Sequence, residues 1–302
     1  MINHNCVFCL ASHSYQSVRA ETVYGGSKEH KFYRCNKCDL VYLWPVPSKK
    51  EQQEFYENKF EEFMSNRTGP ERDWRNPEVH IQTNQDNINR RLPFINDYFS
   101  QGKNVLEIGC SSGYMMETYK SAGMHPIGIE PSKTFRESLI KKGFEVYSNL
   151  EDLMFNKPAL KFDLITHYFV IEHIKDTVSF IKNQLRMLNK DGIIIAEVPC
   201  IQDPLVHLYD IPSFDNFYWI IAHYYYFSPK SISNILNNIK CKYKLIPEQR
   251  YDLSNHMGWM QYGKPGYQDH YNNIFSSDTI NNYKTDLKNK WMCDTMFLYI
   301  WK

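Results

Sequence analysis

Two consecutive apolar runs, each carrying a glutamate at or near its end, constrain this chain more than any other feature of its sequence. The first run, residues 104–108, contains Glu107 and leads into a glycine turn at residues 109–113. The second run, residues 126–129, ends at Glu130, which lies 21 positions after Gly109. A strand, a tight turn, a helix and a second strand that ends in an acid are typical of a nucleoside-binding half of a doubly wound fold.

The composition of the turn indicates which nucleoside binds. A pyrophosphate loop requires Gly-x-Gly-x-x-Gly, but Ser111 and Tyr114 replace the second and third glycines. S-adenosylmethionine has a ribose and no phosphate, and its sulfonium favours a nearby carboxylate such as Glu107. The stretch resembles the first motif of class I S-adenosylmethionine-dependent methyltransferases. The resemblance implies cofactor contacts from Glu107, Gly109, Cys110, Ser111, Gly113, Glu130 and Pro131. A turn whose glycines serve only packing is the alternative.

The downstream sequence continues the same pattern. Residues 162–174 predict a strand and a turn into a helix, and residues 193–199 predict a β-branched strand after a glycine turn at 188–192. This order resembles the same family over about residues 85 to 240. It implies a three-layer, Rossmann-like α/β fold with a seven-stranded sheet, whose last strand, near residues 292–301, is antiparallel. His167, at a strand end, is expected to line the cofactor pocket, and Glu172 with His173 to organise it.

Two Cys-x-x-Cys pairs, 25 residues apart, predict a metal site near the N-terminus. The four cysteines are Cys6, Cys9, Cys35 and Cys38. Four thiolates saturate a tetrahedral zinc ion and leave no position for water, so we expect a structural rather than a catalytic zinc. A redox-active pair is the alternative, although no thioredoxin-like pattern surrounds either motif.

The chain divides into three predicted segments. Residues 1–48 form the zinc-binding module, residues 49–100 a helical connector or lid, and residues 101–302 the methyltransferase domain. Within the connector, helices are expected at about 49–64 and 78–99, with a kink at Pro93 and a polar loop at 66–77 between them.

His223 is the predicted general base. It precedes a capped helix start at Ser228-Pro229 and lies after a strand, at the edge of the sheet where ligands bind. A histidine there can remove a proton from an acceptor near neutral pH. The segment resembles the His-x-x-x-Phe-Ser stretch of zinc-domain sugar methyltransferases, whose histidine is a base. Those proteins carry a tyrosine where this chain has Ile220. A histidine that only orders the loop is an equal alternative.

The segment between the last two predicted strands, residues 253–291, is long enough to project over the cofactor. We expect it to wall the acceptor pocket opposite His223. Its stacking and hydrogen-bonding candidates are His256, Trp259 and Tyr262. A surface insertion without ligand contacts is the alternative.

Charge and hydropathy narrow the acceptor. The net charge of +1 offers no global attraction for nucleic acid, and no apolar run or leader predicts membrane insertion or export, so we expect a cytoplasmic protein. The layout resembles bacterial methyltransferases of polysaccharide and sugar gene clusters. Those that methylate carbon carry a further domain. The expected reaction is therefore O-methylation of a sugar, a nucleotide-linked sugar or a related phosphorylated small molecule in surface-glycan biosynthesis. An RNA methyltransferase that uses its basic zinc module, or a non-catalytic S-adenosylmethionine-binding module, is the alternative.

Overall fold

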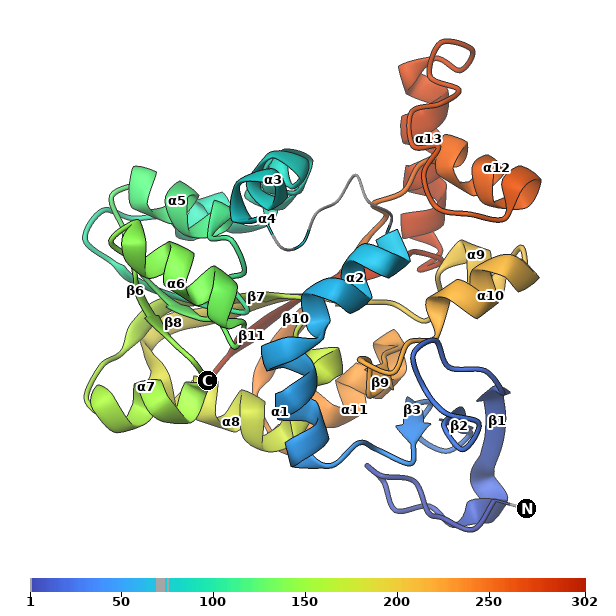
Figure 1. Ribbon diagram of the computed structural model, residues 1–302, viewed down its shortest axis with the longest axis horizontal. Coiled ribbons are helices and arrows are strands. Elements are labelled where there is room, and N and C mark those ends of the chain that lie inside the picture. The colour runs from blue at the N-terminus through green and yellow to red at the C-terminus, as the bar shows by residue number, and fades with distance from the viewer. Residues whose placement is uncertain (1, 69–73, 75) are drawn as a thin grey trace.

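The fold is built on two sheets that lie side by side (Figure 1). The computed structural model describes residues 2–68, 74 and 76–302. The larger sheet has seven strands, in the order β6, β5, β4, β7, β8, β11, β10. Their bounds are Glu145–Tyr147, His125–Ile129, Asn104–Ile108, Phe162–Tyr168, Leu188–Pro199, Thr295–Trp301 and Lys242–Glu248. The first five strands are parallel, and β11 pairs antiparallel with both β8 and β10, which confirms the predicted fold class.

Helices cover both faces of this sheet. On one face lie α4 (Gln85–Ile95), α5 (Tyr114–Ser121) and α6 (Lys133–Lys141), and on the other α7 (Leu150–Asn156), α8 (Thr177–Met187) and α11 (Pro229–Ile239) (Figure 1). Strand β4 contributes side chains to both helical layers, because successive side chains of a strand point to opposite faces of the sheet. Val105 packs in one buried cluster with Met115 of α5, and Leu106 packs in the other with Ile181 of α8. The strand order reverses between β4 and β7, which is where doubly wound sheets bind ligands.

The start of β8 differs from the prediction. Residues 188–192, expected as a turn, form the irregular first part of the strand. Phe162 pairs with Leu188 whereas Leu164 pairs with Ile193, so β8 carries extra residues opposite β7. Gly192 allows this close approach, because a Cβ there would lie 2.8 Å from the carbonyl oxygen of Phe162.

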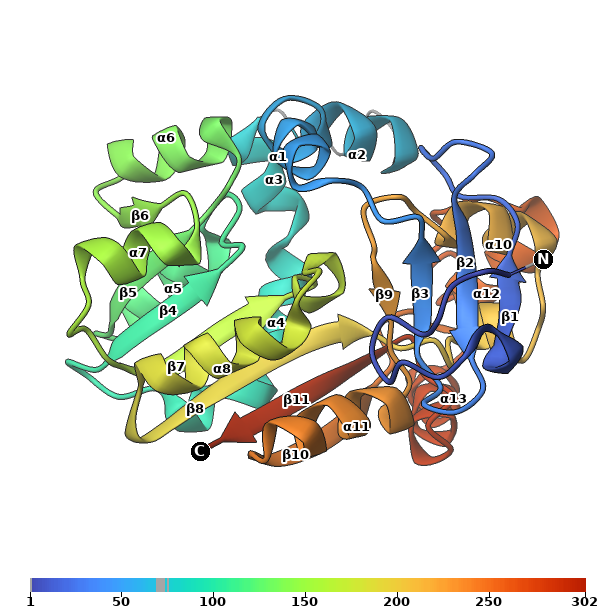
Figure 2. The same ribbon diagram turned by 90° about the horizontal axis from the view of Figure 1, so that it is seen from below.

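The smaller sheet joins the N-terminal segment to the large domain. Its order is β1 (Gln16–Ala20), β2 (Lys31–Cys35), β3 (Val41–Trp44) and β9 (Tyr225–Tyr226), preceded by the 3-10 turn η1 (His13–Tyr15). Strand β9 comes from the chain just after His223 and pairs antiparallel with β3 (Figure 2). Phe32 of β2 packs on the rings of Trp219 and Tyr226 at 5.1 and 5.2 Å. The residues of segment 1–48 therefore share a sheet and a core with residues of segment 101–302.

The described residues of the connector form four helices where two were predicted. They are α1 (Lys49–Asn58), α2 (Phe60–Thr68), α3 (Pro77–Thr83) and α4, and α4 is followed by η2 (Asn96–Tyr98). Pro93 stays inside α4, and the break falls at Asn84 instead. There the Asn84 amide donates to the carbonyl oxygen of His80 at 2.7 Å and competes with the backbone bond that would continue the helix. Of the predicted loop at 66–77, residues 69–73 and 75 lie outside the described residues, whereas residues 66–68 belong to α2 and residue 77 begins α3.

The remaining helices lie near the ends of β8 and β10. They are α9 (Pro204–His207), α10 (Pro212–Tyr218), α12 (Leu253–Tyr262) and α13 (Ser277–Asn289), and η3 (Ile171–His173) follows β7. The insertion 253–291 is thus largely helical, and β10 ends at Glu248. In the described part of the chain, no helix has both the length and the apolar character needed to cross a bilayer.

Candidate active site and metal centre

The glycine turn after β4 needs glycine for two reasons. Gly109 and Gly113 have φ angles of +73° and +83°, which side chains disfavour. A Cβ at Gly109 would also lie 2.7 Å from Val170 Cγ2, and one at Gly113 would lie 2.3 Å from Leu139 Cδ2. Cys110, buried within the turn, donates its backbone N–H to the carbonyl of Ile129 at 3.1 Å. The turn is therefore fixed to the end of β5, beside Glu130.

Glu130 is anchored by backbone amides. Its Oε2 accepts a 2.7 Å hydrogen bond from the N–H of Ser111, and its Oε1 accepts a 2.7 Å bond from the N–H of Ser132. The neighbouring Pro131 carbonyl accepts a bond from Arg136 at 2.9 Å. Burial raises the pKa of Glu130 to about 7. A carboxylate has about four acceptor positions, so two remain for ligand hydroxyl groups.

Glu107 is a buried carboxyl group without a complete set of partners. Its side chain is 3% exposed, and within the described part of the chain its Oε2 has no hydrogen-bond partner. Burial raises the pKa of Glu107 well above its usual value, against the influence of Arg91. A buried acceptor of this kind is costly unless a ligand satisfies it. An adjacent cationic ligand group would do so, and the residues present therefore fit S-adenosylmethionine.

His167 does not lie beside Glu107 and Glu130. Register pairs Glu107 with Thr166 and Ile108 with His167, so Glu107 and His167 lie on opposite faces of the sheet. The His167 ring is fully buried against Phe180 of α8, at 5.6 Å between centroids, and burial lowers its pKa to about 3. The expected placement in the cofactor pocket rested on position along the strand, without regard to which face the side chain occupies.

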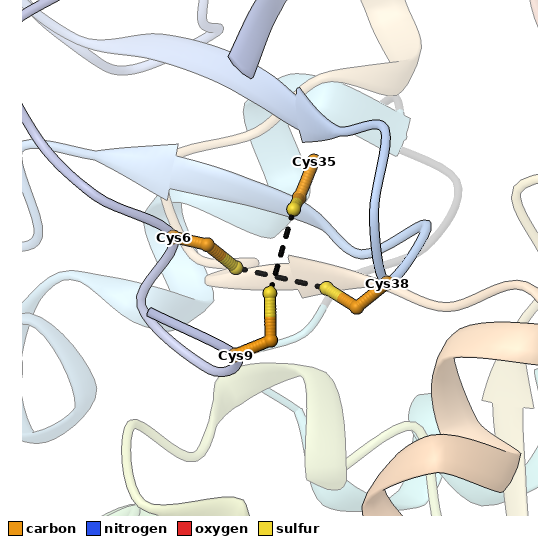
Figure 3. Close-up of side chains that lie close together, drawn as sticks. All are labelled: Cys6, Cys9, Cys35 and Cys38. Atoms are coloured by element: carbon orange, nitrogen blue, oxygen red, sulfur yellow. Dashed lines mark hydrogen bonds between the residues drawn. The ribbon is translucent and has the colours of Figure 1, made fainter. Parts of the chain in front are cut away.

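The four N-terminal cysteines converge on one point (Figure 3). Cys6 Sγ lies 3.6 Å from Cys38 Sγ, Cys9 Sγ lies 3.6 Å from Cys35 Sγ, and all four sulfur atoms lie within 4.8 Å of one another. Zinc–sulfur bonds of about 2.3 Å in a tetrahedron require sulfur atoms roughly 3.8 Å apart, so the site fits zinc. The hydrogen bond between the thiol groups of Cys6 and Cys38 is the main reason that the pKa of Cys6 falls to about 5.

A second convergence lies at the carboxyl edge of the large sheet. Glu172 and His173 follow β7, and the chain before β9 brings His223 beside them, with the two imidazole centroids 4.7 Å apart. The N–H of Tyr224 donates to the carbonyl oxygen of Glu172 at 2.7 Å, which fixes the two segments together. The three side chains can direct ligand atoms to within 4.8 Å of one another.

Comparison with known proteins decides the family. The methyltransferase domain family matches residues 79–243, more than half of the chain. The chain belongs to this methyltransferase family. Structural neighbours show the same fold, among them an Archaeoglobus fulgidus SAM-dependent methyltransferase (TM-score 0.50, 18% identity, 72% of this chain and 94% of that one). Another is the plantazolicin methyltransferase BamL (TM-score 0.52, 14% identity, 82% of this chain and 93% of that one).

The curated relatives match a smaller region. A Haemophilus ducreyi ubiquinone biosynthesis O-methyltransferase is 32% identical over 103 residues, which cover 31% of this chain and 44% of the relative. A Campylobacter jejuni tRNA U34 carboxymethyltransferase is 35% identical over 121 residues, which cover 37% of this chain and 40% of the relative. The match thus spans less than half the length of either relative.

The candidate acceptor residues of this methyltransferase lie in helix α12. Trp259 is 3% exposed and packs on Phe214 and Phe217 of the α10 region, at 4.8 and 5.1 Å. His256 is fully buried, and its Nδ1 bonds the hydroxyl of Tyr283. Tyr262 is 44% exposed and stacks on Tyr267. Two of the three thus serve the packing of the insertion, and none contacts His223 in the structure.

Several residues near the candidate site of this methyltransferase were not predicted. Arg90 and Arg91 of α4 form ion pairs with Glu197, at 2.7 and 3.0 Å, where β8 ends. The Tyr56 hydroxyl of α1 lies 2.8 Å from His173 Nδ1. The pKa of His223 is lowered mainly by burial, and the nearby charges of Arg67 and Arg250 lower it further. Charged and tyrosine residues are common in connectors, so no local signal distinguished these.

Proposed function

We propose that this methyltransferase transfers the S-adenosylmethionine methyl group to a hydroxyl oxygen of a polar small molecule. A sugar, a nucleotide-linked sugar or a related phosphorylated compound of bacterial surface-glycan biosynthesis is the proposed acceptor. The observation that carries the proposal is a cofactor cradle, Gly109–Gly113 with Glu130, that shares one sheet edge with the Glu172–His173–His223 cluster.

The cradle residues have distinct proposed roles. Glu130 would accept hydrogen bonds from the ribose hydroxyls, and the carboxylate of Glu107 would face the cationic part of the cofactor. When bound, S-adenosylmethionine supplies a methyl group on an electrophilic sulfonium. Because the donor is already reactive, holding the acceptor oxygen in line supplies most of the acceleration.

The Glu172–His173–His223 cluster is the proposed acceptor side. His223 Nδ1 is buried and has no hydrogen-bond partner among the residues described, so in the tautomer that carries its proton on Nε2 the Nδ1 lone pair is available to an acceptor group. The predicted base role for His223 uses this lone pair. The name of the Haemophilus relative, an O-methyltransferase, supports oxygen as the methylated atom.

An RNA acceptor is the second candidate, and the tRNA-directed name of the Campylobacter relative favours it. The net charge of +1 counts against it, because nucleic-acid affinity depends largely on neutralising phosphates. We rank it below a small-molecule acceptor. A module that binds the cofactor without turnover is the remaining alternative.

A methyl-transfer assay separates these candidates. Purified protein is incubated with methyl-labelled S-adenosylmethionine and either a panel of nucleotide-linked sugars and sugar phosphates or bulk tRNA. We expect label in the sugar fraction, lost in the Glu130→Ala variant. Label only in tRNA would establish the second candidate. Tight cofactor binding without label in any fraction would favour the non-catalytic module.

A further inference from the structure

The cluster at the carboxyl edge has the composition and free atoms of a cation site. We infer that Glu172, His173 and His223 bind one divalent metal ion, separate from the four-cysteine site, and that an acceptor oxygen completes its coordination. The role in acceptor binding rests on the proposed function, whereas the metal site itself does not.

Glu172 supplies the carboxylate. Its side chain is fully buried, and neither carboxylate oxygen has a hydrogen-bond partner in the described part of the protein. An ionised carboxylate is expensive to bury without donors, and a carboxylic acid would still bury an unused O–H. A metal ion would satisfy both oxygens at once. The backbone at Glu172 is fixed in place, because the N–H of Tyr224 donates a hydrogen bond to the Glu172 carbonyl oxygen.

His173 is oriented as a ligand. Its Nδ1 lies 2.7 Å from the carbonyl oxygen of Ala222, and a carbonyl can only accept, so Nδ1 carries the proton. The lone pair is therefore on Nε2, which lies 4.0 Å from Glu172 Oε1. Histidines that bind metals characteristically donate their other ring N–H to a carbonyl or carboxylate. The Tyr56 hydroxyl oxygen of α1 lies 2.8 Å from the same Nδ1 and can share that proton only as a second acceptor.

His223 supplies the third donor, the unpartnered Nδ1. Its ring packs edge-on to that of His173, and the ligand atoms of all three residues lie within 4.8 Å of one another. Two imidazoles and one carboxylate leave coordination positions open and suit Mn²⁺, Fe²⁺ or Zn²⁺. One lone pair cannot both ligate a metal and accept a proton, so the ligand and base roles of His223 exclude each other.

Nearby charge indicates what fills the open positions. Arg67 and Arg250 both act electrostatically on His223, and Arg250 also forms an ion pair with Asp294 at 3.6 Å. Arg67 has no carboxylate within ion-pair distance among the described residues; its guanidinium lies 3.9 Å from the centroid of the Phe217 ring. An acceptor that carries a phosphate or another anionic group would offset Arg67 while its hydroxyl oxygen meets the metal.

Manganese binding tests the site directly. Mn²⁺ is added to zinc-loaded protein, and the free ion is followed by electron paramagnetic resonance; the four thiolates favour softer metals, so this signal reports the second site. We expect one Mn²⁺ per chain. Glu172→Gln and His223→Ala should each weaken binding by at least about tenfold, because even supporting residues of metal sites cost that much. Glu172→Asp, which keeps a carboxylate, should retain more affinity than Glu172→Gln. His125→Ala, at the opposite end of the sheet, is the control and should bind normally.

The opposite results are equally clear. No Mn²⁺ binding by wild-type protein, or unchanged binding in Glu172→Gln and His223→Ala, would overturn the metal site and leave His223 as a candidate base. Affinity for S-adenosylhomocysteine, measured on the same samples, should be unchanged in both variants. If wild-type protein bound no S-adenosylhomocysteine, the proposed function would fail whatever the manganese result.

Discussion

The proposed cofactor cradle and the Glu172–His173–His223 cluster meet at one edge of the sheet but are assembled differently. Glu130 is held by the backbone of Ser111, 19 positions away, so the cradle is complete within one strand–turn–helix–strand unit. The cluster joins His173 to Tyr56, 117 positions away, and to His223 through a strand shared with the cysteine module. The cradle therefore forms from residues close together in the sequence, whereas the cluster forms only when distant segments of the chain pack together.

The largest expected effect separates the two regions by chemistry. His223→Ala should reduce turnover by about 10²–10⁴-fold, since it removes either a base or a metal ligand. Affinity for S-adenosylhomocysteine should stay within about twofold of wild type, because His223 lies outside the cradle. Turnover is measured with an identified acceptor and affinity by calorimetry. His207→Ala, an exposed histidine of α9, is the control, and near-normal turnover of His223→Ala would make His223 a loop-ordering residue.

Disruption of the cysteine site should lower the stability of the protein as well as its turnover. We predict one tightly bound zinc per chain by elemental analysis. Cys35→Ser should lose it and lower the free energy of unfolding by about 4 kcal/mol or more, as losses of structural metals do. Because β9 pairs with β3, turnover should fall as well, while cofactor affinity stays nearly intact. Cys241→Ser, a cysteine outside the cluster, should do neither, and zinc well below one equivalent in wild type would remove the assignment.

Glu130→Ala should have the reverse pattern. Charge-assisted hydrogen bonds contribute roughly 1.5–3 kcal/mol, so the variant should bind S-adenosylhomocysteine at least about tenfold more weakly. Manganese affinity should not change, because Glu130 lies outside the cluster. The exposed Glu137→Ala on α6 is the matched control. Calorimetry that found equal affinities for wild type and Glu130→Ala would exclude Glu130 as the ribose acid.

A pH dependence should distinguish the cradle further, with a smaller effect. Glu130 has a pKa raised to about 7, and its ionised form accepts the ribose bonds. At pH 6 about one tenth of the population is ionised, so affinity should rise about tenfold or slightly less between pH 6 and pH 8. Glu130→Gln should show a flatter profile. A wild-type affinity that fell with rising pH would contradict the ionised state.

The sequence could predict what is local. The strand–turn–helix–strand unit over residues 104–130 follows from residues fewer than 30 positions apart, where periodicity and glycine positions are informative. The four-cysteine site could also be predicted from the sequence, because each Cys-x-x-Cys motif supplies two of the four metal ligands.

What the sequence could not indicate depends on packing between residues far apart in the chain. The helix break at Asn84 is decided by one side-chain hydrogen bond to His80, and strand register places His167 on the opposite face of the sheet from Glu107. His256 and Trp259 offer ligand-binding groups, but their partners Tyr283 and Phe214 bury them. The Tyr56–His173 contact has no signal in either segment alone.

Direct comparison of two ligands tests the central claim, that the cradle selects S-adenosylmethionine over a dinucleotide. Calorimetry of wild-type protein should detect S-adenosylmethionine or S-adenosylhomocysteine at a single site per chain, with NAD binding far more weakly, because Ser111 and Tyr114 remove the glycines that a pyrophosphate needs. NAD that bound more tightly than S-adenosylmethionine would contradict the account.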